Sequence, residues 1–166
     1  MSEQTTPTAI TQAAGDVAAA LARLQSAVEQ LAEGDLARAP SAGGWSLAKV
    51  ISHLNVCTLI WVGDLHRLAT DPDLAFFFRE EVGHDAAGYP PPTVDIAARQ
   101  LASTRRTLAT TLPATPPQVL DRVVEIPDLD TLTVADWTPL IVGHLVGHVE
   151  QGFAVMHDRN FAPAGF

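Results

Sequence analysis

The sequence predicts an all-α fold, a four-helix bundle with long crossover connections. In four segments, apolar residues recur at the three- and four-residue spacing of an amphipathic helix. There is no internal repeat, and hydrophobic residues make up 47% of the 166 residues, enough for the core of a single domain over residues 1–166. The four predicted helices cover about residues 8–33, 45–70, 93–112 and 135–158.

The first predicted helix is defined by Leu21, Leu24, Val28 and Leu31, and Gly34 provides a C-terminal stop. A segment rich in glycine, proline and alanine follows, which indicates a loop up to residue 44.

The second predicted helix has Ser46 as its N-cap and an apolar stripe that continues for about six turns. It is expected to end near Thr70, before Asp71-Pro72. Residues 71–92 form a long connector, in which the apolar run at 74–78 predicts either a short helix or a plug against the core.

The third predicted helix begins after Thr93 as N-cap and stops at Leu112-Pro113. The next connector has strand-like composition at 119–126 and 129–134, which predicts a small β-hairpin that would be marginal alone. The fourth helix begins near residue 135, where Pro139 is tolerated in the first turns, and runs to about Asp158.

Composition excludes several classes of protein. The net charge is −9 and the ten basic residues are scattered, so we expect no nucleic-acid binding. The N-terminal residues lack the pattern of a signal peptide and no apolar run is long enough for a membrane span. The single cysteine, Cys57, fits a reducing compartment, so we expect a cytoplasmic protein. The low content of charged residues, 17%, is compatible with a homodimer.

Three histidines suggest a metal site. His144 and His148 stand four residues apart and share one face of the fourth predicted helix, and His53 lies in the apolar part of the second. If these helices pack together, three imidazoles converge and can hold one divalent ion with an open coordination position. The alternative is a set of hydrogen-bonded core histidines, because a spacing of four is a weak motif by itself.

Two runs of sequence carry a family resemblance. The run Trp45-Ser-x6-His53 and the run Trp137-Thr-x5-His144-x3-His148-x2-Gln151 resemble the signature of the DinB-like (YfiT-like) family, which is related to the N-terminal domain of mycothiol-dependent maleylpyruvate isomerases. The resemblance implies a bundle with a divalent ion, often zinc or nickel, held by the three histidines. For some members it also implies S-transferase or isomerase chemistry with a low-molecular-weight thiol.

Three neighbours of the histidines are candidates for supporting roles. Gln151, three residues after His148, could bond to a ligand histidine or to substrate. Asp64 returns to nearly the same helix face as His53 and could bond to a ligand histidine or to substrate, although a solvated carboxylate at a helix end is the more common explanation. Cys57, four residues after His53, is either a thiolate ligand or a small buried apolar residue.

These observations leave three functions open. The first is a metal-dependent enzyme in which a bound thiol is deprotonated for S-transfer or isomerisation. The second is a hydrolase, in which the same ligands acidify a bound water. The third is a non-catalytic bundle that binds a small molecule or a partner. Gly143 and Gly147, each next to a motif histidine, would allow another helix to approach that face closely.

Overall fold

The protein is a bundle of four long helices, as the sequence predicts. The computed structural model describes residues 5–40, 43–74, 93–125 and 131–158. Its long helices are α1 (Thr5–Val28), α2 (Leu47–Thr70), α4 (Val94–Ala114) and α6 (Val134–His157), and its short elements are the 3-10 helix η1 (Asp35–Ala37), α5 (Pro117–Leu120), β1 (Val123–Val124) and β2 (Leu132–Thr133). Apart from Leu74, the predicted apolar segment at 74–78 lies outside the described residues.

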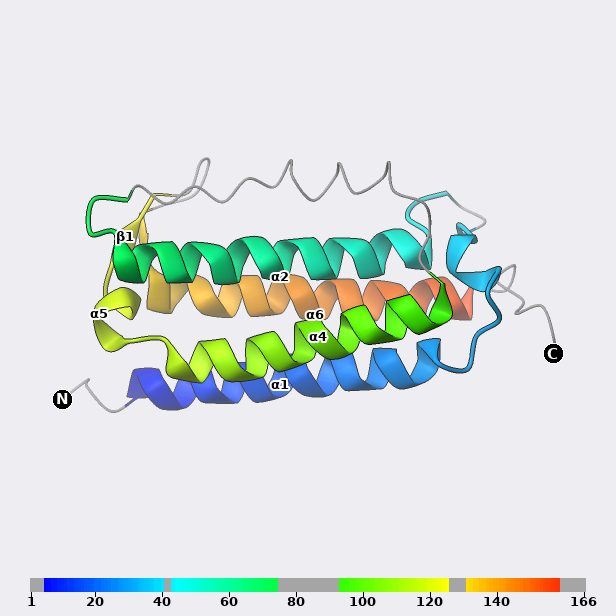
Figure 1. Cartoon of the computed structure of the whole chain (residues 1–166), viewed down its shortest axis with the longest axis horizontal. Coiled ribbons are helices and arrows are strands. Elements are labelled where there is room, and N and C mark those ends of the chain that lie inside the picture. Colours follow the sequence, from blue (N-terminus) through cyan, green and yellow to red (C-terminus); the bar gives the residue numbers. More distant parts are fainter. Residues whose placement is uncertain (1–4, 41–42, 75–92, 126–130, 159–166) are drawn as a thin grey trace.

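The order of the helices around the bundle differs from their order in the chain. α1 packs against α4 and α6, and α2 packs against the same two helices, so α1 is diagonal to α2 and α4 is diagonal to α6. α1 and α6 run in one direction and α2 and α4 in the other (Figure 1). Consequently α2 and α6, the helices that carry the motif histidines, are antiparallel neighbours.

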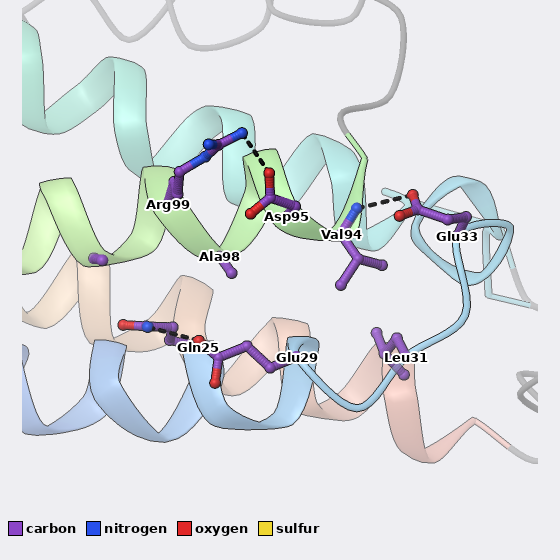
Figure 2. A pocket seen from close by; sticks show the side chains of 9 residues that line it. Gln25, Glu29, Leu31, Glu33, Val94, Asp95, Ala98 and Arg99 are labelled. Atoms are coloured by element: carbon purple, nitrogen blue, oxygen red, sulfur yellow. Dashed lines mark hydrogen bonds and ion pairs between the residues drawn. The ribbon is translucent and has the colours of Figure 1, made fainter.

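Side-chain caps fix where the helices begin. The hydroxyl oxygens of Ser46, Thr93 and Thr133 accept hydrogen bonds from backbone N–H groups in the first turns of α2, α4 and α6. The start of α4 has a second acceptor, because Glu33 accepts from the Val94 N–H at 2.9 Å and so joins the end of the α1 region to α4 (Figure 2). These bonds satisfy donors that a helix start otherwise leaves without a partner.

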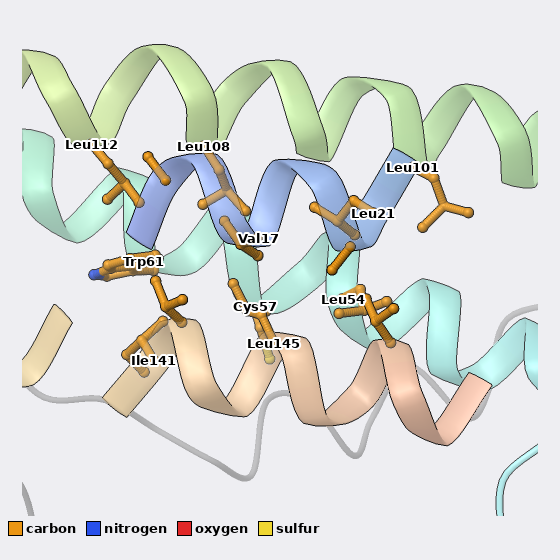
Figure 3. Packing of buried hydrophobic residues seen from close by; sticks show 14 of the residues in the cluster. Val17, Leu21, Leu54, Cys57, Trp61, Leu101, Leu108, Leu112, Ile141 and Leu145 are labelled. Atoms are coloured by element: carbon orange, nitrogen blue, oxygen red, sulfur yellow. The ribbon is translucent and has the colours of Figure 1, made fainter. Parts of the chain in front are cut away.

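The core lies between the four helices and is formed by their apolar stripes. Figure 3 shows side chains of α1, α2, α4 and α6 meeting along the bundle axis, among them Leu21, Leu54, Leu108 and Leu145, each almost fully buried. Each helix alone exposes an apolar stripe, so burial in the bundle supplies most of its stability. In the described part of the chain, no helix is long and apolar enough to cross a membrane.

Two helix ends differ from the prediction. α1 ends at Val28 rather than near residue 33, because Asp35 accepts a hydrogen bond from the Ala32 N–H at 3.0 Å and draws the chain into a turn. Leu31 still packs against the core, which explains why its spacing continues the helical pattern. α4 continues through Pro113 to Ala114 before Thr115 ends it.

The connector between α4 and α6 holds a smaller hairpin than predicted. Val119 and Leu120, predicted as strand, belong to α5 and are buried. Among the described residues of the connector, Val123–Val124 pairs with Leu132–Thr133 in antiparallel register, and positions 126, 129 and 130 of the predicted strands lie outside the described residues. Arg122 fixes this connector to the end of α2. Its guanidinium donates to the carbonyl oxygens of Leu68, Asp71, Pro72 and Leu74 at 2.7–3.0 Å.

Candidate metal centre

The three motif histidines meet between α2 and α6. His53 comes from the second turn of α2 and is 3% exposed, whereas His144 and His148 come from successive turns of α6 and are half-buried. One ring nitrogen of each lies within 4.8 Å of the other two. The His53 ring centroid is 4.2 Å from that of His148 and 5.4 Å from that of His144.

The spacing of the nitrogens fits a single small ion. Nitrogens that ligate one Zn²⁺ at ~2.0–2.1 Å in tetrahedral geometry lie about 3.3 Å apart. The Nε2 atoms of His53 and His144 are 3.1 Å apart, which is close to that value. Without an ion, this contact is a hydrogen bond in which one Nε2 carries the hydrogen and the other accepts it.

Gln151 determines which nitrogen of His148 is available. Its Oε1 lies 2.7 Å from His148 Nδ1, and because a side-chain carbonyl oxygen can only accept, Nδ1 is the protonated nitrogen. The lone pair of His148 is therefore on Nε2. Metal-binding histidines typically donate their second ring N–H to an oxygen in this way.

Trp45 lies against two of the three imidazoles. Its indole is parallel to the His148 ring, with an interplanar angle of 3° and 5.4 Å between centroids, and meets the His53 ring edge-on at 4.9 Å. The ammonium of Lys49 is 4.7 Å from the centre of the indole. In the sequence Trp45 opens the run that resembles the family signature, but its contacts with the two imidazoles were not predicted, because ring stacking across two helices depends on the loop conformation.

Cys57 is next to His53 on the core side. Its Sγ is 3.4 Å from His53 Nε2 and 3.7 Å from Nδ1, and the side chain is 6% exposed. Figure 3 shows it among the buried side chains of the core. The thiol therefore adjoins the histidine cluster from within the apolar core, although it is outside the group whose ligand atoms are all within 4.8 Å of one another.

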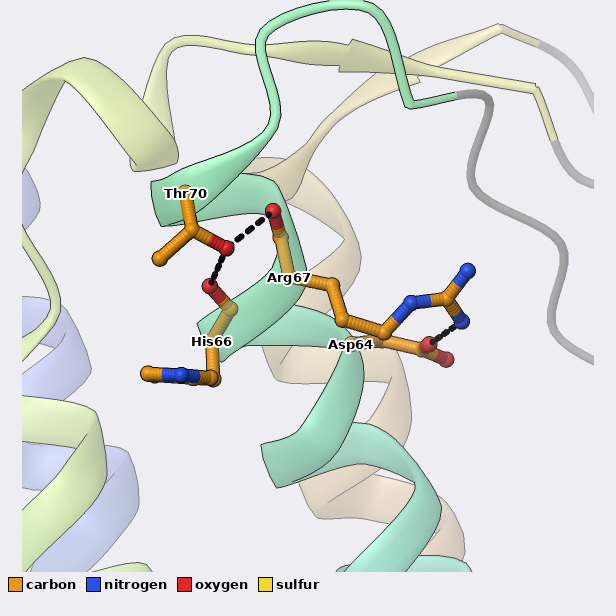
Figure 4. A network of polar contacts seen from close by, with 4 residues as sticks. All are labelled: Asp64, His66, Arg67 and Thr70. Carbon is orange, nitrogen blue, oxygen red and sulfur yellow. Dashed lines mark hydrogen bonds and ion pairs between the residues drawn. The ribbon is translucent and has the colours of Figure 1, made fainter.

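Asp64 is placed three turns along α2 from His53. It is 7% exposed, and its carboxylate accepts from the Arg67 guanidinium at 3.1 Å (Figure 4). Burial raises the pKa of the Asp64 carboxyl above its ordinary value, and the positive charge of Arg67 partly opposes the rise. Eleven residues of helix correspond to about 16 Å, so Asp64 is remote from the imidazoles.

The glycines beside the motif histidines are uncovered. Gly143 and Gly147 are exposed, and a Cβ built on either would meet no described atom within 4 Å. The helix that the sequence suggested at this face is thus absent from the described part of the chain. The close approach occurs at Gly152 instead, where a Cβ would be 3.2 Å from Leu24 Cδ1 of α1.

Comparison with known proteins gives one family and one fold. The family model described as the DinB superfamily matches residues 16–151, most of the chain and all three histidines. No curated protein matches the sequence.

A solved structure, YfiT from Bacillus subtilis, shares the fold with a TM-score of 0.70 and 18% sequence identity. The similarity covers 98% of this chain and 91% of that one. YfiT is described as a probable metal-dependent hydrolase with an unusual four-helix bundle topology.

Proposed function

Because this chain belongs to the DinB superfamily, we propose that it is an enzyme dependent on a divalent metal ion held by His53, His144 and His148. The observation that carries this proposal is the convergence of three ring nitrogens from two helices within 4.8 Å. Zinc or nickel is the expected ion, because both accept neutral imidazole ligands.

The protein supplies an oriented, partly buried set of neutral donors. His53, His144 and His148 would hold a divalent ion without neutralising its charge, and an ion bound there would lower the pKa of a water or thiol ligand. Gln151 holds His148 with Nε2 toward the cluster. The burial of His53 keeps the donor on α2 out of bulk water.

Hydrolysis of a small molecule is the favoured reaction. Three-histidine ligation serves water and thiol nucleophiles alike, and the description of YfiT as a probable metal-dependent hydrolase favours water. Thiol S-transfer or isomerisation is the second candidate, supported by the sequence resemblance to the N-terminal domain of mycothiol-dependent maleylpyruvate isomerases.

The metal is tested first. Untagged protein purified without chelator should contain about one divalent ion per chain by elemental analysis. His144→Ala should lose it, whereas His66→Ala, which removes an exposed histidine of α2, should keep it. Protein that binds neither zinc nor nickel after reconstitution would disprove the proposal.

The reaction is tested next with zinc- or nickel-loaded protein. A panel of activated esters and amides should be cleaved without added thiol, and His144→Ala should abolish the cleavage. Turnover of electrophiles that appears only with a low-molecular-weight thiol would select the second candidate. Absence of both activities in fully loaded protein would favour a binding role.

A further inference from the structure

We propose that Trp45 is a positioning residue for the metal centre, which holds the His53 and His148 rings in the orientation that the ion requires. This inference rests on the proposed function. Trp45 contacts the rings of two of the three histidines and would not bind the ion itself. It precedes α2, so it supports the histidines from a loop and not from either of the helices that carry them.

The two ring contacts of Trp45 are of different kinds and restrict different motions. The parallel stack on the indole opposes any tilt of the His148 ring away from the parallel orientation. The hydrogen bond to Gln151 opposes rotation of the same ring within its own plane. The edge-on contact limits how His53 can turn toward Trp45. One indole thereby contacts a histidine from each of the two helices. Aromatic contacts of this kind stabilise a structure by more than the burial of their surface alone.

The loop before α2 places the indole. Gly43 and Gly44 have φ values of 83° and 116°, a region that L-residues with a side chain rarely adopt. The Gly43 N–H donates to the Pro40 carbonyl oxygen at 3.0 Å, and Trp45 lies between these glycines and Ser46, the N-cap of α2. Lys49, in the first turn of α2, lies over the indole and adds a contact that keeps it in place.

The first test measures zinc affinity by competition with a chromogenic chelator. Trp45→Ala should weaken binding about tenfold, because it removes the aromatic contacts with both ligand rings. Trp45→Phe keeps a flat ring and should stay within about threefold of the parent protein. Leu59→Ala, which truncates an exposed apolar side chain of α2, is the matched control and should bind as the parent does.

A spectroscopic measurement separates positioning from general stability. The visible absorption of bound Co²⁺ depends on the arrangement of its ligands. Trp45→Ala should change that spectrum while the circular dichroism of the metal-free protein stays the same, and Trp45→Phe should restore it. An unchanged Co²⁺ spectrum together with unchanged zinc affinity in Trp45→Ala would overturn the proposal.

A double-mutant cycle tests the role of the turn. Gly44→Ala forces a side chain into a positive-φ conformation and should weaken zinc binding several-fold in the parent protein. In the Trp45→Ala background it should have almost no further effect, because both changes act through one indole. Additive losses would show that the turn acts on the site by another route and would overturn this placement of Trp45.

The failure of this inference differs from the failure of the proposed function. A parent protein that binds no zinc or nickel overturns both. A parent that matches Trp45→Ala in both zinc affinity and Co²⁺ spectrum overturns the positioning role alone.

Discussion

The hydrogen bond from His148 to Gln151 has a measurable consequence. Gln151→Ala removes the acceptor that fixes the His148 tautomer, so zinc affinity should fall about 10- to 100-fold. Glu150→Ala, one residue earlier, removes an exposed partner of Arg23 and should leave zinc affinity unchanged. Competition with a chelator measures both, and equal affinities of the two variants would contradict this role of Gln151.

Asp64 should make the stability of the fold depend on pH. Its pKa is higher in the folded than in the unfolded chain, so the folded chain binds more protons between the two values, and stability falls as pH rises through that window. Asp64→Asn removes this dependence. Urea titrations from about pH 3 to about pH 6 should show the parent losing stability relative to the variant as pH increases. The opposite slope would mean that attraction to Arg67 outweighs desolvation.

Some features of the centre follow from the sequence at the scale of single residues, and others do not. The helical repeat places His144 and His148 on one face, and three-residue spacing brings Gln151 within reach of His148. The same repeat aligns Asp64 with His53, but the rise of about 1.5 Å per residue puts the two about 16 Å apart along the helix axis. The contacts of Trp45 could not be predicted from helical spacing, because they depend on the φ angles of Gly43 and Gly44 and on the packing of α6 against α2.

Arg122 holds two secondary-structure elements together, and we refer to its four hydrogen bonds as the Arg122 clamp. One guanidinium caps the carbonyl end of α2 and ties the α5–β1 connector to it, with four donated bonds. Arg122→Ala should lower the free energy of unfolding by about 2 kcal/mol, since bonds from charged donors are among the stronger ones.

Two further variants isolate the geometry of this clamp. Arg122→Lys keeps the charge but not the planar fork, so most of the loss should remain. Arg106→Ala on an exposed position of α4 should change stability by no more than about 0.5 kcal/mol. Denaturant titration gives the free energy of unfolding of all three variants. If Arg122→Lys is as stable as the parent protein, the charge and not the planar geometry of Arg122 is what matters.

Replacing Gly143 or Gly152 of α6 by alanine should change the stability of the protein in different ways. Gly143→Ala adds a methyl group in open space and should stabilise the protein by about 1 kcal/mol through helix propensity. Gly152→Ala gains the same propensity but presses on Leu24 and Leu47, so its stability should be clearly lower than that of Gly143→Ala. Thermal unfolding compares the two variants, and equal gains would show that the α1–α6 contact has room for a methyl group.

The periodicity that locates the helices is less informative about their ends. Leu31 keeps the apolar spacing of α1 although the helix has ended, because the turn after Val28 returns its side chain to the core. Val119 and Leu120 suggest a strand by composition, yet Pro117 starts a single helical turn there. Local propensity is too weak to decide such short segments against tertiary packing.

For the whole molecule, a metal ion that binds only the folded chain should stabilise it. Free zinc at about 100 times its dissociation constant should add about 2.7 kcal/mol to the free energy of unfolding, and a chelator should remove this gain. His144→Ala should unfold at the same temperature with and without zinc, while His66→Ala should retain the shift. A zinc-dependent shift that survives in His144→Ala would locate the binding elsewhere.

The architecture as a class follows from the sequence, whereas the arrangement of the helices does not. Four amphipathic segments predict a bundle, but each apolar stripe is compatible with several neighbours. Nothing in Leu21 or Leu108 specifies that α1 packs against α4 rather than α2. The connectors are long enough to permit more than one arrangement of the helices. The fit between the apolar stripes then determines which helices lie diagonal to each other.

This diagonal arrangement affects how the protein is made. During translation α1 and α2 emerge first, but their partners in the finished bundle are α4 and α6, and α6 is the last long helix to be synthesised. The nascent chain must therefore keep the side of α2 that packs against α6 uncovered until α6 leaves the ribosome, a state that favours association with chaperones. Since His144 and His148 arrive with α6, the three histidines come together only after α6 has been synthesised.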